Sequence, residues 1–90
     1  MAYADALIEA PEACLNKNSA GEEIYRVGLM YSTGMGVAID YVAAHKWFNL
    51  AALKGVKEAR MLRREMVDYM STQELRQAQR SAREWMQKAN

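Results

Sequence analysis

Residues 24–55 read IYRVGLMYSTGMGVAIDYVAAHKWFNLAALKG. In the first part of this stretch, four apolar or small residues recur at i, i+3, i+4 and i+7, which is the spacing of one helix face. They are Ile24, Val27, Gly28 and Tyr31. A turn is expected at Gly34 and Gly36, because glycine adopts positive φ angles without steric cost. Asp40 is expected to cap a second helix by accepting hydrogen bonds from its free N–H groups. The stretch therefore predicts a helical hairpin.

The second helix of this hairpin has a broad apolar face. Its members are Tyr41, Ala44, Trp47, Phe48, Ala51 and Ala52. Gly55 is expected to end the helix in the left-handed conformation. Gly28 costs about 1 kcal/mol relative to alanine in mid-helix, so we expect it to permit close approach of the paired helix. Beside these small residues, Trp47 and Phe48 are interpreted as core side chains rather than as a ligand site.

Residues 56–90 predict two further helices. The third is expected from about residue 56 to residue 70. Its inward residues are expected to be Ala59, Leu62, Met66 and either Tyr69 or Met70. Ser71 and Glu74 have the spacing of a capping box, which starts a fourth helix. The inward stripe of this helix is expected to be Leu75, Ala78, Ala82, Trp85, Met86 and Ala89.

Residues 21–58 resemble one unit of the Sel-one-like repeat family, whose helical hairpins are related to tetratricopeptide repeats. The resemblance is carried by residues 27–31 and 34–37, Asp40, Tyr41, Ala44, Trp47, Phe48, Ala51, Ala52 and Gly55. It implies an all-α fold, a right-handed α-α superhelix in which hairpins stack into a solenoid. Glu23 departs from the family pattern, which usually has alanine there, and is expected to lie at an exposed chain end.

The second half of the chain repeats this pattern only in part. A shift of 38 residues places Ala44 on Ala82 and Trp47 on Trp85, whereas a shift of 36 places Gly28 on Arg64. Residues 57–90 are therefore interpreted as a degenerate repeat that forms a C-terminal capping hairpin, and their tail resembles that of many bacterial family members. The well-formed repeat is assigned to residues 19–56.

Residues 1–18 are interpreted as an N-terminal cap, which is expected to be helical. Within it, Pro11 either ends one helix or opens another, because proline suits the first helical turn but not the interior. Stable solenoids usually need about three stacked units. Either this N-terminal segment or a second copy of the chain, in a homodimer, is expected to complete the stack.

Composition excludes several classes of protein. The 90 residues suit one small domain, and 12 basic against 11 acidic residues give a net charge of +1, unlike a polyanion-coating tail. The chain begins without a secretory signal and has no apolar stretch long enough to span a membrane, so no membrane partner is expected. Cys14, the only cysteine, is interpreted as a small apolar residue of the N-terminal cap. A cytoplasmic location is expected, or a periplasmic one if the chain is a processed mature form.

No arrangement of residues predicts catalysis, so we do not expect an enzyme and assign no catalytic residue, cofactor or metal ligand. His45 is the only histidine, and it lacks the cluster of histidines and cysteines that a metal site needs. As a catalytic base it would need a nucleophile at a matching position, which the spacing does not supply. We expect His45 on a solvated helix face.

Charge is unevenly distributed along the chain. Residues 1–45 hold two basic and six acidic side chains, a net charge of −4, whereas residues 46–90 hold ten basic and five acidic, a net charge of +5. Most of the second value comes from Arg60, Arg63, Arg64, Arg76, Arg80 and Arg83. Such a surface attracts an acidic protein or peptide, phosphate groups or RNA. A solvated helix surface, partly neutralised by nearby carboxylates, is the simpler interpretation.

The resemblance favours a non-enzymatic protein–protein interaction module, an adaptor or scaffold, with a protein or peptide partner. In such solenoids the first helix of each hairpin usually lines the binding groove. The candidate partner-binding residues are therefore Tyr25, Arg26, Leu29, Ser32, Arg60, Arg64 and Glu65. The main alternative is a structural or self-associating protein without a dedicated ligand. A weak nucleic-acid binder that uses the basic C-terminal half is a further alternative, but nucleic acid is not the expected partner.

Overall fold

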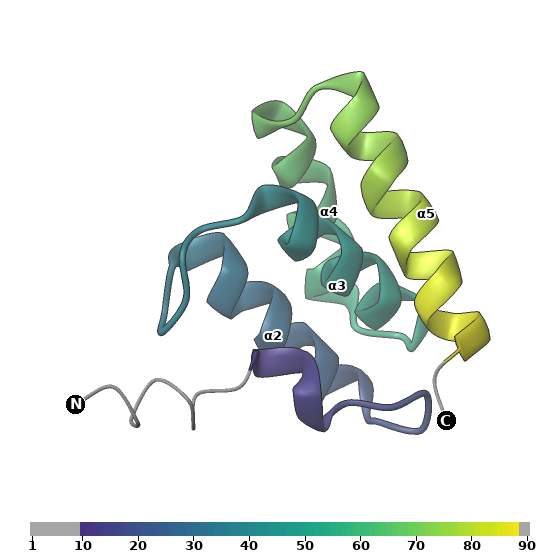
Figure 1. Ribbon diagram of the computed structural model, residues 1–90. Coiled ribbons are helices and arrows are strands. Elements are labelled where there is room, and N and C mark those ends of the chain that lie inside the picture. Colours follow the sequence, from purple (N-terminus) through teal and green to yellow (C-terminus); the bar gives the residue numbers. More distant parts are fainter. Residues whose placement is uncertain (1–9, 89–90) are drawn as a thin grey trace, which may run out of the picture.

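The computed structural model describes residues 10–88, which form four α-helices and two short 3₁₀ helices (Figure 1). The elements in chain order are η1 (Pro11–Cys14), α2 (Gly21–Thr33), α3 (Tyr41–Leu53), α4 (Lys57–Met66), η2 (Val67–Tyr69) and α5 (Thr72–Lys88). These residues contain no β-strand. None of the helices in this part of the chain is both long and apolar enough to cross a membrane. The predicted all-α fold is confirmed.

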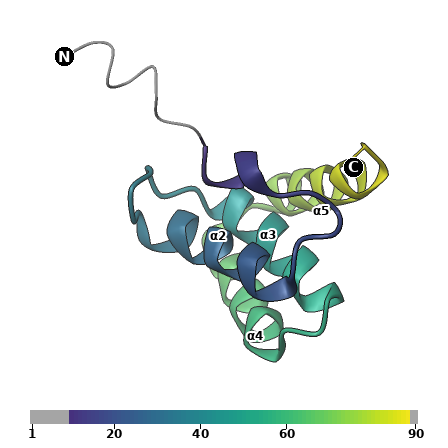
Figure 2. The same ribbon diagram turned by 90° about the horizontal axis from the view of Figure 1, so that it is seen from below.

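Helix α3 is the centre of the molecule, because α2, α4 and α5 all pack against it. Figure 2 shows α3 between these three helices. Lys46 is the only Lys, Arg, Asp or Glu residue in α3, and a helix that is apolar on all sides is buried on all sides. Its buried residues are Ala44, His45, Trp47, Phe48, Leu50 and Ala51.

The first hairpin closes through a contact between Gly28 of α2 and Phe48 of α3. Phe48 is fully buried, and a Cβ atom at Gly28 would lie 2.6 Å from two atoms of its ring. No side chain larger than that of glycine fits at this position unless the ring moves. The predicted close approach of the two helices at Gly28 is confirmed.

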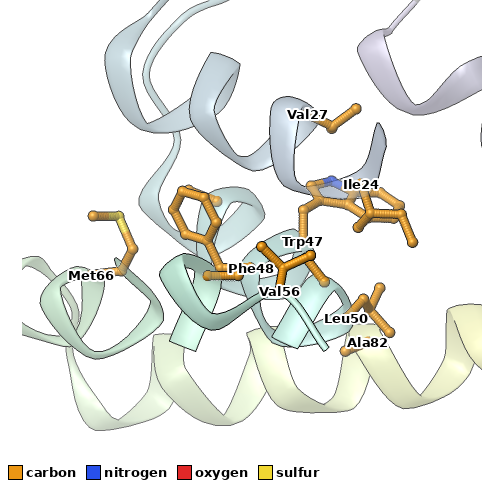
Figure 3. Close-up of a cluster of buried hydrophobic side chains, with 11 residues drawn as sticks. Ile24, Val27, Trp47, Phe48, Leu50, Val56, Met66 and Ala82 are labelled. Atoms are coloured by element: carbon orange, nitrogen blue, oxygen red, sulfur yellow. The ribbon is translucent and has the colours of Figure 1, made fainter. Parts of the chain in front are cut away.

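Trp47 connects the first hairpin with α5. Its ring meets the ring of Trp85 edge to face, with the centroids 5.2 Å apart, which is a favourable aromatic geometry. Trp47 is buried and Trp85 half-buried, so the interpretation of Trp47 and Phe48 as core side chains is confirmed. The buried cluster extends across all four α-helices, from Ile24 in α2 to Ala82 in α5 (Figure 3).

The turns and caps of the first hairpin agree with the sequence pattern. Gly34 and Gly36 have φ angles of 76° and 77°, and Gly55 has a φ angle of 95° after the end of α3. The Asp40 side chain caps α3, because its Oδ1 accepts a hydrogen bond of 3.0 Å from the backbone N–H of Ala43. These local signals fix where the two helices begin and end.

Helix α4 is shorter than expected, since the α-helix ends at Met66 and the chain tightens into η2. A 3₁₀ turn has about 3.0 residues rather than 3.6, which rotates the following side chains away from the original helix face. Tyr69 is consequently 62% exposed and stacks on Tyr41, with ring centroids 4.6 Å apart. Met70, the other candidate for this inward position, packs half-buried against the core.

Helix α5 begins with the predicted capping box. The N–H of Glu74 donates to Ser71 Oγ at 3.1 Å, and the N–H of Ser71 donates to Glu74 Oε1 at 2.8 Å. In the predicted stripe, Ala78 and Ala82 are buried, whereas Leu75 and Trp85 are half-buried. Met86 is 41% exposed, and Ala89 lies outside the described residues. The stripe therefore faces α3 at its small residues.

The segment before α2 packs along the first hairpin. Pro11 opens η1, which is one of the two predicted alternatives, whereas residues 1–9 of the expected helical cap lie outside the described residues. The Tyr31 hydroxyl donates to Glu12 Oε1 at 2.7 Å. Burial, followed by this hydrogen bond, raises the pKa of Tyr31 to about 12. Cys14 is exposed rather than packed as an apolar residue.

Glu23 has a local role at the start of α2. It is exposed, as expected. Its Oε1 accepts a hydrogen bond of 2.9 Å from the backbone N–H of Ala20. A carboxylate in the first turn also complements the positive end of the helix dipole. The departure of Glu23 from the family pattern therefore stabilises the helix end.

Candidate functional site

An open cleft of about 410 Å³ lies between α4 and α5, next to α3. Both α4 and α5 pack against α3, and they make few contacts with each other. Figure 1 shows the two helices separating below their connection at η2. The lining residues are His45 and Asn49 of α3, Arg60, Arg63 and Arg64 of α4, Val67 of η2, and Leu75 and Gln79 of α5.

Helical periodicity explains why these side chains share one cleft. Residues 60, 63, 64 and 67 stand at i, i+3, i+4 and i+7, so they lie on one flank of α4 and its extension. The residues from α3 and from α5 are likewise pairs at i and i+4. The lining contains three arginines and no carboxylate. The side chains of the lining that carry a permanent charge are therefore all positive.

One arginine is held in place by the floor of the cleft. Arg63 Nη1 donates a hydrogen bond of 2.6 Å to Asn49 Oδ1, and both residues are half-buried. This bond directs the carbonyl oxygen of the amide toward Arg63 and leaves its NH₂ group as a donor. Arg60 and Arg64, in contrast, are exposed at the mouth of the cleft.

His45 lies at the floor of the cleft, and the expectation that it is solvated is wrong. Its side chain is 3% exposed, and its Nδ1 atom is buried without a hydrogen-bond partner. Burial, and then the nearby Arg63 guanidinium, lowers the pKa of His45 below its ordinary value. The expectation failed because α3 has neighbours on three sides and so has no wide solvated face.

The candidate residues on α2 lie away from this cleft. Tyr25 and Leu29 are half-buried and pack in part against the core, and the Tyr25 ring lies 5.9 Å from that of Phe48. The Ser32 hydroxyl donates to the carbonyl of Leu29 at 3.1 Å. Arg26 is exposed. These four residues therefore differ in their freedom to contact a partner, and Arg26 has the most.

The candidate residues on α4 divide between two flanks of that helix. Arg60 and Arg64 line the cleft together. Glu65 is exposed and does not line it. Glu58, which precedes Glu65 by two helical turns, lines a hollow together with Gly21 and Glu22 of α2. Burial, and then the charge of Glu58, raises the pKa of Tyr25. The structure thus brings two of the seven candidates into one site and leaves the other five outside it.

Four polar residues of the cleft were not among the candidates. Arg63 could have been found from its spacing, since it stands three residues after Arg60 on the same flank. His45, Asn49 and Gln79 carry no such signal, because their position depends on how α3 and α5 pack. Sequence spacing within one helix predicts a flank of that helix but not the opposite wall.

The chemistry available in the cleft is that of anion binding. Arginine guanidinium groups and the Asn49 amide are hydrogen-bond donors, and the lining provides no serine, threonine or cysteine nucleophile. Among residues 10–88, no group of three His, Cys, Asp or Glu side chains is placed to hold a metal ion. These donors suit the cleft to the binding of an anionic group.

Comparisons with known proteins agree with this architecture. The family model for the Sel1 repeat matches residues 24–56 and 72–90, which cover more than half of the chain. Neither the comparison with curated proteins nor the comparison with solved structures found a match. Sel1 repeats are helical repeats of the solenoid type, and the first matched segment coincides with the hairpin of α2 and α3. The chain belongs to the Sel1 repeat family.

Proposed function

We propose that the chain is a non-catalytic protein–protein interaction module, which acts as an adaptor or scaffold. Membership of the Sel1 repeat family supports this function at the level of the family. The observation that carries it in this chain is the cleft between α4 and α5, where three arginines meet without a carboxylate in the lining. Unneutralised charge in a preformed concave site favours binding of a partner with complementary charge.

The test is recovery of the partner from the native cells of this protein. A tagged chain would be cross-linked in the cells, purified and examined by mass spectrometry, with the tag alone as a control. A partner recovered only with the chain would then be purified and titrated against it by calorimetry. Direct saturable binding supports the proposed function, whereas recovery of the same proteins with the tag alone contradicts it.

Self-association is a second candidate, because an apolar hollow of about 270 Å³ lies between the end of α3 and α5. Leu50, Leu53, Ala82 and Met86 contribute its apolar lining, and Leu53 is 71% exposed. Sedimentation equilibrium at two protein concentrations tests this candidate. A mass that rises with concentration in the chain and not in Leu53→Ser supports a dimer through this hollow. A constant monomer mass contradicts it.

A further inference from the structure

The cleft between α4 and α5 has more hydrogen-bond donors than acceptors. Asn49 Oδ1 already accepts from Arg63, so the amide offers its donor group to the cleft. Arg60 and Arg64 add exposed guanidinium groups, each with donors in a planar fork. A ligand that matches this site must therefore supply acceptors, and a negatively charged acceptor gives the strongest hydrogen bonds.

The positions of Arg60 and Arg64 suit one carboxylate held between two cations. Residues at i and i+4 of a helix have Cβ atoms about 5–6 Å apart, so both guanidinium groups can approach the same anion. Neither side chain forms a hydrogen bond within the described residues. Both are free to rearrange around a ligand without breaking a bond in the fold.

The floor of the cleft contains a polar group whose hydrogen bonding is incomplete. His45 is buried with Nδ1 unpartnered, and a buried polar atom without a hydrogen bond is costly. Burial, and then the neighbouring Arg63, disfavours charge on the imidazole and so lowers its pKa. An anion that enters the cleft counteracts the second of these effects, so occupancy is expected to change the surroundings of the imidazole.

The shape of the cleft favours an acidic peptide over nucleic acid. Its volume of about 410 Å³ lies in the range of small-ligand pockets, about 300–1,000 Å³, whereas single-stranded nucleic acids need a positive groove that follows several nucleotides, with aromatic side chains for stacking. The lining has no Phe, Tyr or Trp ring, its one imidazole, that of His45, is buried, and Val67 and Leu75 give it apolar edges. Apolar edges suit a peptide in which acidic and aliphatic side chains alternate.

We propose that this cleft binds an acidic segment of a partner protein, with a side-chain carboxylate between Arg60 and Arg64 and an adjacent aliphatic side chain against Val67 and Leu75. The inference rests on the proposed interaction function and assigns it a site and a class of partner. Arg63 and Asn49 keep the floor polar, and the imidazole of His45 is expected to respond to the bound charge.

The test is a nuclear magnetic resonance titration of the full chain with a blocked peptide of alternating leucine and glutamate. His45 is the only histidine, so in a chain without a histidine tag its imidazole nitrogen resonances report on the floor of the cleft without ambiguity. We expect these resonances and the amides of α4 and α5 to shift in a saturable manner. The matched peptide with glutamine in place of glutamate is expected to cause no saturable shift.

A charge-matched pair of variants separates the cleft from net charge. Arg60→Gln with Arg64→Gln is expected to weaken binding about tenfold or more, because each charge-assisted hydrogen bond contributes strongly to affinity. Arg76→Gln with Arg80→Gln removes the same charge from a different hollow of the surface and is expected to leave the affinity unchanged. All four arginines are exposed, so neither pair should disturb the fold.

Four results would overturn the proposal. The glutamine peptide could bind as tightly as the glutamate peptide, or the two double variants could lose affinity equally. In the third, the glutamate peptide causes no shift at millimolar concentration. In the fourth, a short oligouridylate displaces the glutamate peptide and binds more tightly. A failure of the proposal for the cleft can be distinguished from a failure of the proposed interaction function. If wild type and the Arg60 and Arg64 double variant recover the same partner equally well, the interaction function stands and the cleft is not its site.

Discussion

The two hairpins of this protein pack differently, although their sequences align in part. In the first hairpin, Gly28 brings α2 against Phe48 of α3 and the helices close on each other. In the second, α4 and α5 both pack on α3 and leave a cleft between them. The residue aligned with Gly28 in the second hairpin is Arg64, which lines that cleft. At this position, therefore, glycine accompanies close packing of two helices, whereas arginine lines the cleft of the hairpin that stays open.

The largest expected effect comes from the tryptophans that the two hairpins share by alignment. Trp47→Ala is expected to lower the free energy of unfolding by about 3–5 kcal/mol, because it empties a fully enclosed position. Trp85→Ala is expected to cost about 1–2 kcal/mol, since its ring is only half-buried. Urea denaturation followed by far-ultraviolet circular dichroism measures both. Equal losses would contradict the view that the first hairpin is the better packed.

The next effect concerns the closing contact of the first hairpin. Gly28→Ala is expected to destabilise the protein by about 1–3 kcal/mol through overpacking against Phe48, despite the gain of about 1 kcal/mol in helix propensity. The same substitution in a Phe48→Leu background should cost less, because the smaller side chain relieves the clash. Urea denaturation of the four chains gives the interaction energy. An interaction energy near zero would show that the ring does not require glycine.

Substitutions at the helix caps compare the two hairpins through smaller expected changes in stability. Asp40→Ala and Ser71→Ala each remove a side-chain oxygen that accepts a backbone N–H, and each is expected to cost about 1 kcal/mol. Thermal unfolding by calorimetry measures both changes, with Thr33→Ala as a control outside the N-caps. If Ser71→Ala alone has no effect, α5 begins without help from its cap.

The smallest expected effect is a dependence of stability on pH that comes from His45. Its pKa is lowered in the folded state from the ordinary value of 6.5, so the unfolded chain takes up a proton first as the pH falls. The contribution is therefore present above pH 6.5 and is lost as the pH falls below that value toward the folded-state pKa. Melting temperatures at pH 7.5 and pH 5.5 should show the loss, and His45→Gln should reduce it. An equal loss in His45→Gln would assign the dependence to other groups.

The parts of the fold that local sequence signals control were predictable. Asp40, the turn glycines and the capping box of Ser71 and Glu74 act within a few residues of their own positions, so their pattern predicts the helix ends. The close approach at Gly28 was predictable for a different reason, because an unfavourable residue in mid-helix needs a compensating contact. The end of α4 at Met66 was not predictable. The change to η2 depends on tertiary packing, which leaves Tyr69 on the surface rather than in the core.

Only the α4 wall of the cleft could be predicted from the sequence. Arg60 and Arg64 are visible from the charge pattern, but the floor depends on the packing of α3. The lack of charged residues in α3, apart from Lys46, already indicates a helix without a solvated face. A solvated face for His45 follows only when its lack of metal and catalytic partners is considered alone. The residues of α3 and α5 that contact each other are far apart in the chain, so no regular spacing in the sequence predicts their contact.

The central position of α3 affects how the whole molecule unfolds. In long repeat arrays each unit contacts only its neighbours, so units can melt one after another. Here α2, α4 and α5 share a single support, so loss of α3 releases all three at once and the chain should unfold cooperatively. The slowest amide hydrogen exchange is therefore expected in α3. A ligand that bridges α4 and α5 would protect helices that it never touches.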